Sequence, residues 1–221
     1  MPLRTRLLSK VQGYIFDIDG TIMDSHDGHY RAWDRTTRAH GGAFTKEQIV
    51  AHFGKTTAQI AIELLKLTDP AVIESVSREK ASYFLEEIPS LKLFDGVIDV
   101  FKKVKKNGTR LCLASSNERN VIEKIINDFN LGQFVDAFVS LDDITKGKPD
   151  PEMIIKSAQK LHLNPRDCVM VGDTIYDIQA GQRAGCGASV AVLTGTFTRA
   201  QLEPQKPSLI LPHVKDLLPY I

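Results

Sequence analysis

Short apolar runs alternate with helix-length amphipathic stretches along most of this 221-residue sequence. The runs have the near-continuous apolar character of strands that are covered on both faces of a parallel sheet. They are Val11–Phe16, Arg110–Ala114, Ala137–Ser140, Cys168–Val171 and Ala188–Leu193. The helical stretches between them are Val97–Lys106, Arg119–Phe129, Pro151–Leu161 and Ile175–Ala184. The alternation predicts an α/β fold built on a doubly wound parallel sheet, to which Leu209–Leu211 and His213–Leu218 add an edge strand and a short helix.

One stretch interrupts this alternation. Residues 24–90 contain no convincing strand but four helical patterns, Gly28–Ala39, Lys46–Phe53, Thr57–Leu67 and Ala71–Glu87. A chain of this length can form one domain that carries an insertion. We therefore expect an α/β core made of residues 1–23 and 91–221, with a helical domain inserted at residues 24–90.

The charge balance excludes several classes of partner. With 28 Lys+Arg against 27 Asp+Glu, the formal net charge is +1, so no concentrated basic face is expected for nucleic acid or a membrane surface. The basic residues 1–10 are not followed by an apolar segment of signal-peptide length, and no run is long enough to cross a bilayer. Three cysteines without CxxC spacing predict a reduced, cytoplasmic protein without disulfides or zinc. A monomer and a homodimer are both compatible with the sequence.

Two carboxylates follow the first strand directly, in the run Asp17-Ile18-Asp19-Gly20-Thr21. Like charges this close repel each other, and partial burial disfavours both ionised forms. A bound cation, or a reaction that uses one carboxylate as nucleophile and the other as acid or base, would account for them. The alternative is an ordinary strand end that runs into an Asp-Gly turn.

Polar side chains also follow two other predicted strands. Ser115, Ser116 and Asn117 come after Arg110–Ala114, and Asp173 comes after the run that begins at Cys168. Ligands of open α/β sheets bind at the carboxyl ends of the strands, so these residues are expected around one crevice. Each could instead cap a helix, but capping is compatible with phosphate binding at the same helix N-terminus.

Two further charged residues complete the set. Lys148 precedes Pro149 and Pro151, which stiffen the backbone and favour a fixed cation over a solvated loop lysine. Asp177 lies four residues after Asp173, one helical turn away on the same face, although a surface acid in a first helical turn is the alternative. Four carboxylates and one lysine leave an excess of negative charge that would repel a phosphate dianion. The residue set therefore predicts Mg²⁺, a hard cation that oxygen ligands prefer.

At this point a family resemblance can be stated. Asp17-x-Asp19-Gly20-Thr21, Ser115, Lys148-Pro149-x-Pro151 and Gly172-Asp173-x-x-x-Asp177 resemble, in order, the four motifs of the haloacid dehalogenase superfamily. The insertion after the first motif is similar to that of the helical-cap subfamily of phosphoglycolate phosphatases and β-phosphoglucomutases. The resemblance implies a Mg²⁺-dependent phosphatase of a small phosphorylated metabolite, such as phosphoglycolate or a sugar phosphate, acting through an aspartyl-phosphate.

The resemblance also implies roles for individual residues. Asp17 would be the nucleophile, and Asp19 would be the general acid and then the general base. Asp17, the backbone carbonyl of Asp19 and Asp173 would bind Mg²⁺, with Asp177 as a ligand or a supporting residue. The residues expected to hold the phosphoryl group are Thr21, Ser115, Ser116, Asn117 and Lys148.

The insertion is expected to read the leaving group. The string His29-Tyr30-Arg31-Ala32-Trp33 is similar to that of β-phosphoglucomutases. Core packing is the expectation for Trp33, whereas His29 and Lys55 are candidates for substrate binding. Thr57 stands where mutases carry an arginine, which argues against a phosphomutase, although Lys55 offers a substitute cation. A non-catalytic phosphometabolite-binding module is the remaining alternative.

Overall fold

A six-stranded parallel sheet forms the centre of the computed structural model, which describes Leu8 and residues 11–221. The basic stretch noted at residues 1–10 lies, apart from Leu8, outside the described residues. The strand order is β5-β4-β1-β6-β7-β8. The strands are β1 (Gly13–Phe16), β4 (Arg110–Ala114), β5 (Ala137–Val139), β6 (Cys168–Gly172), β7 (Ala188–Val192) and β8 (Leu209–Leu211). The predicted doubly wound sheet is confirmed, including the edge strand at Leu209–Leu211.

Helices cover both faces of this sheet. On one face lie α5 (Val97–Lys106), α6 (Arg119–Asp128) and the 3₁₀ helix η7 (Val214–Tyr220). On the other face lie α7 (Glu152–Lys160) and α8 (Ile175–Arg183).

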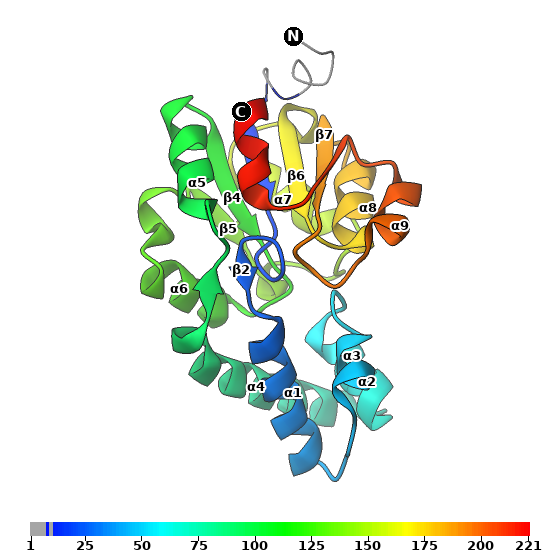
Figure 1. Ribbon diagram of the computed structural model, residues 1–221. Coiled ribbons are helices and arrows are strands. Elements are labelled where there is room, and N and C mark those ends of the chain that lie inside the picture. Colours follow the sequence, from blue (N-terminus) through cyan, green and yellow to red (C-terminus); the bar gives the residue numbers. More distant parts are fainter. Residues whose placement is uncertain (1–7, 9–10) are drawn as a thin grey trace.

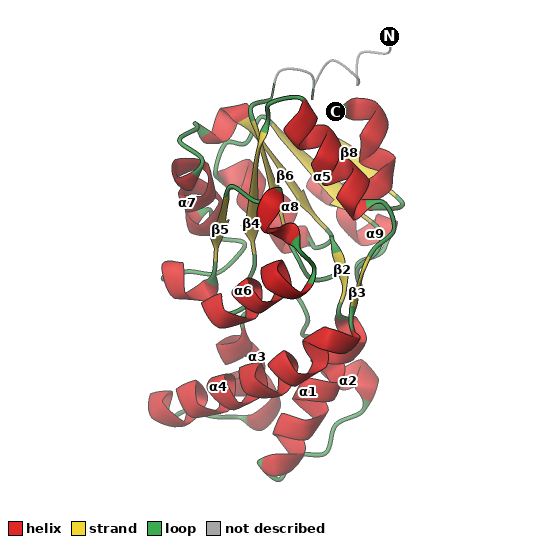
Figure 2. Cartoon of the chain, turned by 90° about the vertical axis from the view of Figure 1, so that its left-hand side faces the viewer, coloured by secondary structure: helices red, strands yellow, loops and turns green. Residues whose placement is uncertain are grey.

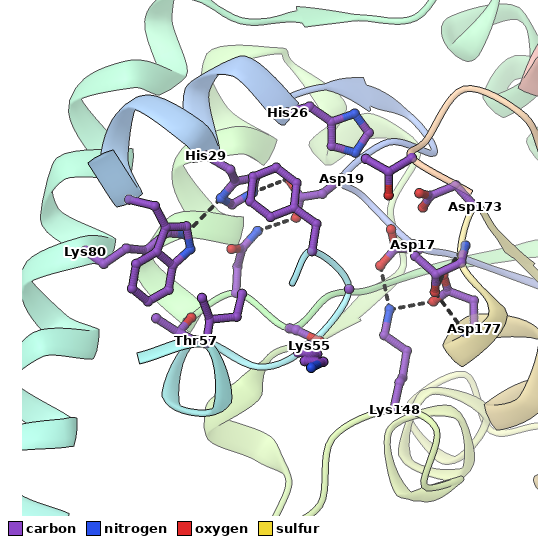
Figure 3. Close-up of a pocket in the computed structure, with 18 residues that line it drawn as sticks. Asp17, Asp19, His26, His29, Lys55, Thr57, Lys80, Lys148, Asp173 and Asp177 are labelled. Atoms are coloured by element: carbon purple, nitrogen blue, oxygen red, sulfur yellow. Dashed lines mark hydrogen bonds and ion pairs between the residues drawn. The ribbon is translucent and has the colours of Figure 1, made fainter. Parts of the chain in front are cut away.

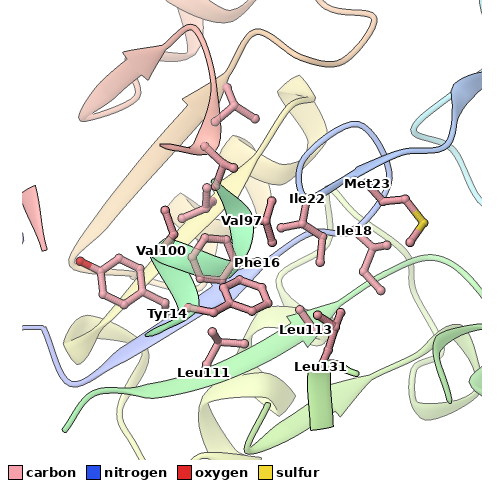
Figure 4. Close-up of a cluster of buried hydrophobic side chains, with 14 of the residues drawn as sticks. Tyr14, Phe16, Ile18, Ile22, Met23, Val97, Val100, Leu111, Leu113 and Leu131 are labelled. Atoms are coloured by element: carbon pink, nitrogen blue, oxygen red, sulfur yellow. The ribbon is translucent and has the colours of Figure 1, made fainter. Parts of the chain in front are cut away.

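The central strand supplies both cores, because successive side chains of a strand point to opposite faces. Tyr14 and Phe16 of β1 pack with α5, as Figure 4 shows, whereas Ile15 packs with α7. The apolar run at β1 therefore reflects burial on both sides.

Four helices interrupt the sheet between β1 and β4. They are α1 (His26–Ala39), α2 (Lys46–Val50), α3 (Thr57–Leu65) and α4 (Pro70–Glu87). They form a separate layer beyond the end of the sheet (Figures 1 and 2). Trp33, Ile49, Ile60 and Val76 make a small core within this layer, so Trp33, 1% exposed, is a packing residue as expected.

Two very short strands connect this layer to the sheet. β2 (Met23–Asp24) and β3 (Lys92–Leu93) pair antiparallel and bring both connections to the same place (Figure 2). Sequence periodicity did not predict them, because two residues carry no period. We refer to residues 24–90 as the helical insertion.

The remaining elements are short. They are α9 (Arg199–Leu202) and the 3₁₀ helices η2 (Ile88–Ser90), η3 (Leu131–Gln133), η4 (Leu141–Asp143), η5 (Pro165–Asp167) and η6 (Glu203–Gln205). Within the described part of the chain, no helix has the length and apolar character needed to span a membrane.

Candidate active site

The carboxyl ends of three neighbouring strands bring the motif residues together. β1 lies between β4 and β6, so Asp17 stands between Ser115 and Asp173. Chain order reverses at this point of the sheet, which is where open α/β sheets bind ligands. A cavity of about 80 Å³ opens here, with the sheet edge on one side and the helical insertion on the other (Figure 3).

Asp17 and Lys148 form a buried ion pair. Lys148 Nζ donates to Asp17 Oδ1 and to Asp177 Oδ1, at 2.6 Å each. The Lys148 side chain is only 5% exposed, so the loop lysine is fixed, as its flanking prolines indicated. Burial raises the pKa of Asp17 to about 7, although the charge of Lys148 opposes that rise. Ionised Asp17 is therefore destabilised in this site.

Asp173 adds a third carboxylate to this cluster. Oxygens of Asp17, Asp173 and Asp177 lie within 4.8 Å of one another, and all three residues are buried. Burial and the charge of Asp17 raise the pKa of Asp173 well above its usual value. Thr21, which is fully buried, donates from Oγ1 to Asp173 Oδ1 at 3.0 Å. Thr21 thus holds a carboxylate and is absent from the described lining of the cavity.

Glycines allow the loops to close around Asp173. Gly20 has a φ of +75°, and a Cβ there would lie 2.7 Å from Asp173 Oδ2. A Cβ on Gly195, in the loop after β7, would overlap the same oxygen. A side chain at either position would displace the carboxylate.

This cluster fits a divalent cation. Three buried carboxylates that repel one another are stabilised by a bound cation, and oxygen donors with open positions suit Mg²⁺. The backbone of Asp19 forms an isolated β-bridge with Met23. In this bridge Gly20 N donates to Met23 O, and Met23 N donates to Ile18 O. Neither bond uses the Asp19 carbonyl, which is left available as a further oxygen donor.

The carboxylate of Asp19 has a separate set of partners. Ser25 Oγ donates to Oδ1 at 2.7 Å, and His29 Nε2 lies 2.8 Å from the same oxygen. Asn117 Nδ2 donates to Oδ2 at 2.7 Å, and Ser115 Oγ does so at 3.4 Å. Burial tends to raise the pKa of Asp19, but His29 and Ser25 outweigh it and hold the pKa well below its usual range. The two acids of the first motif thus have opposite pKa shifts.

His29 connects Asp19 to a buried lysine that sequence reasoning missed. Lys80 Nζ, on α4, lies 2.8 Å from His29 Nδ1, and the ring of His29 stacks on Phe84 at 3.7 Å. Burial and the charge of Lys80 lower the pKa of His29 to about 4. The sequence did hold a signal: Lys80 stands midway between Val76 and Phe84, at helical spacing on an apolar face.

Three more residues that were singled out in the sequence line the cavity, and they differ in their contacts. Ser116 and Thr57 line it. Lys55 also lines it, but its ammonium pairs with Glu63 Oε2 at 2.5 Å, and His52 Nδ1 lies 2.6 Å from the same oxygen. Lys55 is therefore partly neutralised. His26, which was not singled out, lines the cavity beside Phe53, with ring centroids 5.8 Å apart.

The loop before α3 of the insertion lies close to two segments of the core. A Cβ on Gly54 would lie 3.0 Å from the ring of Tyr176 and 3.2 Å from Thr174 Cγ2. A Cβ on Gly147, next to Lys148, would lie 2.5 Å from Thr56 Cγ2. The loop before α3 thus packs directly against the loops that carry the motif residues.

Comparison with known proteins places this architecture in a family. The sequence model of the haloacid dehalogenase-like hydrolase family matches residues 14–192. Pyrophosphatase PpaX of Bacillus mycoides is 26% identical over 213 residues, which cover 96% of this chain and 97% of that protein.

Solved structures share the fold. β-Phosphoglucomutase from Clostridium difficile has a TM-score of 0.83 at 22% identity, covering 95% of this chain and 97% of that one. A predicted phosphoglycolate phosphatase from Haemophilus somnus has a TM-score of 0.83 at 19% identity, covering 96% and 98%. Because the family model matches residues 14–192, most of the sequence, the chain belongs to the haloacid dehalogenase-like hydrolase family and is a hydrolase.

Proposed function

We propose that this hydrolase is a Mg²⁺-dependent phosphatase of a small phosphorylated metabolite and acts through an aspartyl-phosphate. The observation that carries the proposal is the separation of Asp17 from Asp19. One belongs to the buried carboxylate–lysine cluster, and the other faces the insertion with four hydrogen-bond partners. Neighbouring acids whose environments push their pKa values apart are suited to different catalytic roles.

Asp17 is the proposed nucleophile. Its carboxylate attacks phosphorus in line and forms the aspartyl-phosphate as the bond to the leaving oxygen breaks. Lys148 binds Asp17 Oδ1 and is positioned to offset negative charge on the phosphoryl oxygens. Asp177 fixes Lys148, because it accepts from Lys148 through Oδ1 and from Thr174 through Oδ2.

Asp19 is the proposed acid and base. Its low pKa makes it a carboxylate before substrate arrives, and a phosphate dianion bound beside it raises its affinity for a proton. Protonated Asp19 gives that proton to the leaving oxygen, and the resulting carboxylate takes a proton from the water that hydrolyses the intermediate. Asn117 and His29 hold the two oxygens in place for both steps.

Asp17, Asp173 and the carbonyl of Asp19 are the proposed Mg²⁺ ligands, with Thr21 orienting Asp173. The cation, when bound, neutralises charge on the cluster and on the phosphoryl oxygens. Ser115 and Ser116 remain proposed phosphoryl contacts at the end of β4. Ser115 already accepts from Asn117 N at 3.1 Å, which shapes this loop.

The helical insertion is the proposed specificity domain, with residues 1–23 and 91–221 as the core. The cavity of about 80 Å³ is far smaller than the roughly 300–1,000 Å³ of pockets for drug-sized ligands, which favours a small substrate. Phosphoglycolate, pyrophosphate and sugar phosphates are candidates, since relatives carry the names of enzymes that act on such compounds.

A phosphomutase is the less favoured alternative. Thr57 lies at the cavity where the resemblance places a mutase arginine, and Lys55 is already paired with Glu63. A mutase needs a bisphosphate activator and shows migration of phosphate, so its product would retain all phosphate on the sugar. Neither Lys55 nor Thr57 offers a free cation at the mouth of the cavity for a second phosphate.

The test is hydrolysis of a panel of phosphorylated metabolites and an aryl phosphate, with Mg²⁺ and with EDTA. We expect release of inorganic phosphate that requires Mg²⁺, and a phosphorylated Asp17 trapped by rapid acid quench. Full turnover by Asp17→Asn would refute the nucleophile. Metal binding without turnover across the panel would instead support a non-catalytic binding module.

A further inference from the structure

The loop that carries Lys148 is held by one carboxylate that lies outside the cavity. This loop connects η4 to α7, and Glu152 is the first residue of α7. Glu152 Oε2 accepts from Thr145 N at 2.9 Å, from Thr145 Oγ1 at 2.8 Å and from Lys146 N at 2.9 Å. Backbone N–H groups in a loop need partners beyond those of a helix or strand, and here one oxygen pairs two of them. The carboxylate therefore fixes the backbone directly before Lys148.

The backbone of Glu152 holds the loop on the other side of Lys148. Asp150 N donates to Gly147 O at 3.0 Å, which closes a tight turn around Lys148. Glu152 N in turn donates to Asp150 Oδ1 at 3.0 Å. The loop is thus tied to the start of α7 before and after Lys148, and Glu152 takes part in both connections.

The carboxylate of Glu152 is charged while it makes these bonds. Lys156 Nζ, one turn further along α7, donates to Glu152 Oε1 at 2.7 Å. The hydrogen bond from Lys156, followed by those from the loop, lowers the pKa of Glu152 to about 2. Hydrogen bonds to an ionised carboxylate are stronger than those between neutral groups. Lys156 binds one oxygen and the loop binds the other, so the two interactions can be removed separately.

The place of the Lys148 backbone matters because its ammonium has two partners on different elements. Lys148 Nζ lies 2.6 Å from Asp17 Oδ1, after β1, and 2.6 Å from Asp177 Oδ1, on α8 (Figure 3). A lysine stem is flexible and carries a point charge, so the stem alone does not select this position. Misplacement of a catalytic group by on the order of 1 Å can lower a rate by about 10²-fold.

We propose that Glu152 is a positioning residue, which holds the loop so that Lys148 reaches both of its carboxylate partners. The side-chain bonds of Glu152 reach the loop and Lys156 rather than the cavity, so its effect on the reaction passes through Lys148. The inference rests on the proposed function, in which Lys148 offsets charge on the phosphoryl oxygens. Such charge changes in the transition state, so the effect should fall on kcat more than on KM.

Three variants separate this role from a surface ion pair. Glu152→Ala removes both carboxylate oxygens, whereas Glu152→Gln keeps an amide oxygen that can accept from the same N–H groups. Lys156→Met removes the ion pair and leaves the bonds from Glu152 to the loop, so it is the matched control. We expect kcat for a phosphate monoester to fall by about 10²-fold in Glu152→Ala, with KM near that of wild type. Glu152→Gln should recover most of kcat, and Lys156→Met should leave it unchanged.

A second measurement needs no turnover. The Lys148 ammonium is followed by NMR through its side-chain resonances, and hydrogen exchange is measured at the amides of Thr145 and Lys146. In Glu152→Ala the Lys148 signal should move from its wild-type position and both amides should exchange faster. Both should stay close to wild type in Lys156→Met.

The possible outcomes are distinguishable. A Lys148 signal that is identical in Glu152→Ala and wild type overturns the inference, because Lys148 then keeps its place without Glu152. A wild-type kcat in an active Glu152→Ala enzyme overturns it as well, and a lower urea midpoint alone would show only that Glu152 stabilises the fold. A displaced Lys148 signal in a protein that hydrolyses no phosphate ester of the panel would instead overturn the proposed function and leave the positioning of Lys148 intact.

Discussion

Replacing the proposed nucleophile should stabilise the protein in the absence of metal. Burial raises the pKa of Asp17 to about 7, whereas an unfolded chain holds this carboxyl at 3.8. Between these values the folded state keeps a proton that the unfolded state has lost, so stability falls as pH rises through this window. This difference between the folded and unfolded pKa of Asp17 lowers the free energy of unfolding by about 4 kcal/mol at pH 8, where Asp17 is ionised in both states.

Asp17→Asn removes that charge and keeps the shape. We expect the metal-free variant at pH 8 to gain up to about 4 kcal/mol in free energy of unfolding, a rise in Tm on the order of 10 °C. The gain should shrink toward pH 4, because wild-type Asp17 is then protonated in the folded state. Added Mg²⁺ should stabilise wild type and have little effect on the variant, because a cation favours the ionised cluster.

The assay is urea unfolding in EDTA at pH 5.5, 7 and 8, repeated with Mg²⁺. Asp24→Asn is the matched control, because Asp24 is an exposed carboxylate at the end of β2. Its stability should follow that of wild type at each pH. An Asp17→Asn variant that is less stable than wild type at pH 8 in EDTA would refute the reasoning. In that case the attraction between Asp17 and Lys148 would stabilise the fold by more than burial of the ionised carboxylate destabilises it.

Three further outcomes are expected. Asp19→Asn should keep the stabilisation by Mg²⁺, because the proposed metal donor is the backbone carbonyl of residue 19. The same variant should lower kcat by about 10²–10⁴-fold for alkyl phosphates and by less for nitrophenyl phosphate, whose leaving group needs no proton. Equal losses on both substrates would contradict the acid role. Lys148→Met should destabilise the metal-free protein by about 3–5 kcal/mol in urea unfolding, because two buried carboxylates lose their partner; an unchanged midpoint would contradict this. Gly147→Val should raise KM with little loss of stability, because its side chain meets Thr56 and holds the insertion off the core; an unchanged KM would show that this contact does not limit closure.

The core of the site could be predicted from the sequence because each of its residues lies next to the sequence pattern that places it. Asp17, Ser115 and Asp173 each follow an apolar run directly, so strand prediction alone places them at one edge of the sheet. Lys148 was recognisable from its flanking prolines. The resemblance to known motifs then supplied their order and roles, which stay proposals for the individual residues.

The part of the site contributed by the insertion was less predictable, because it depends on how helices pack. Lys80 faces His29 only because α4 lies against α1, and no local sequence pattern predicts that contact. Lys55 was singled out as a candidate for substrate binding and a substitute cation, but its pairing with Glu63 depends on the turn before α3. Thr21 was expected at the substrate, whereas its hydroxyl donates to Asp173, a residue brought near by the sheet.

The separation of Asp17 from Asp19 follows from the turn between them. Residues two apart on a strand point to the same side, but the chain leaves β1 at Phe16 and turns back through Gly20. Asp17 consequently enters the cluster with Lys148, while Asp19 points to the insertion.

The partners of Asp19 come from both parts of the molecule. Asn117 belongs to the core, whereas Ser25 and His29 belong to the insertion. The proposed nucleophile is therefore complete within the core alone, whereas the proposed acid has its partners on Oδ1 only when the insertion lies against the core. In the proposed mechanism, protonation of the leaving group would be coupled to the placement of the insertion over the substrate. A site without the insertion in place would then form the proposed aspartyl-phosphate poorly from any ester whose leaving group needs a proton.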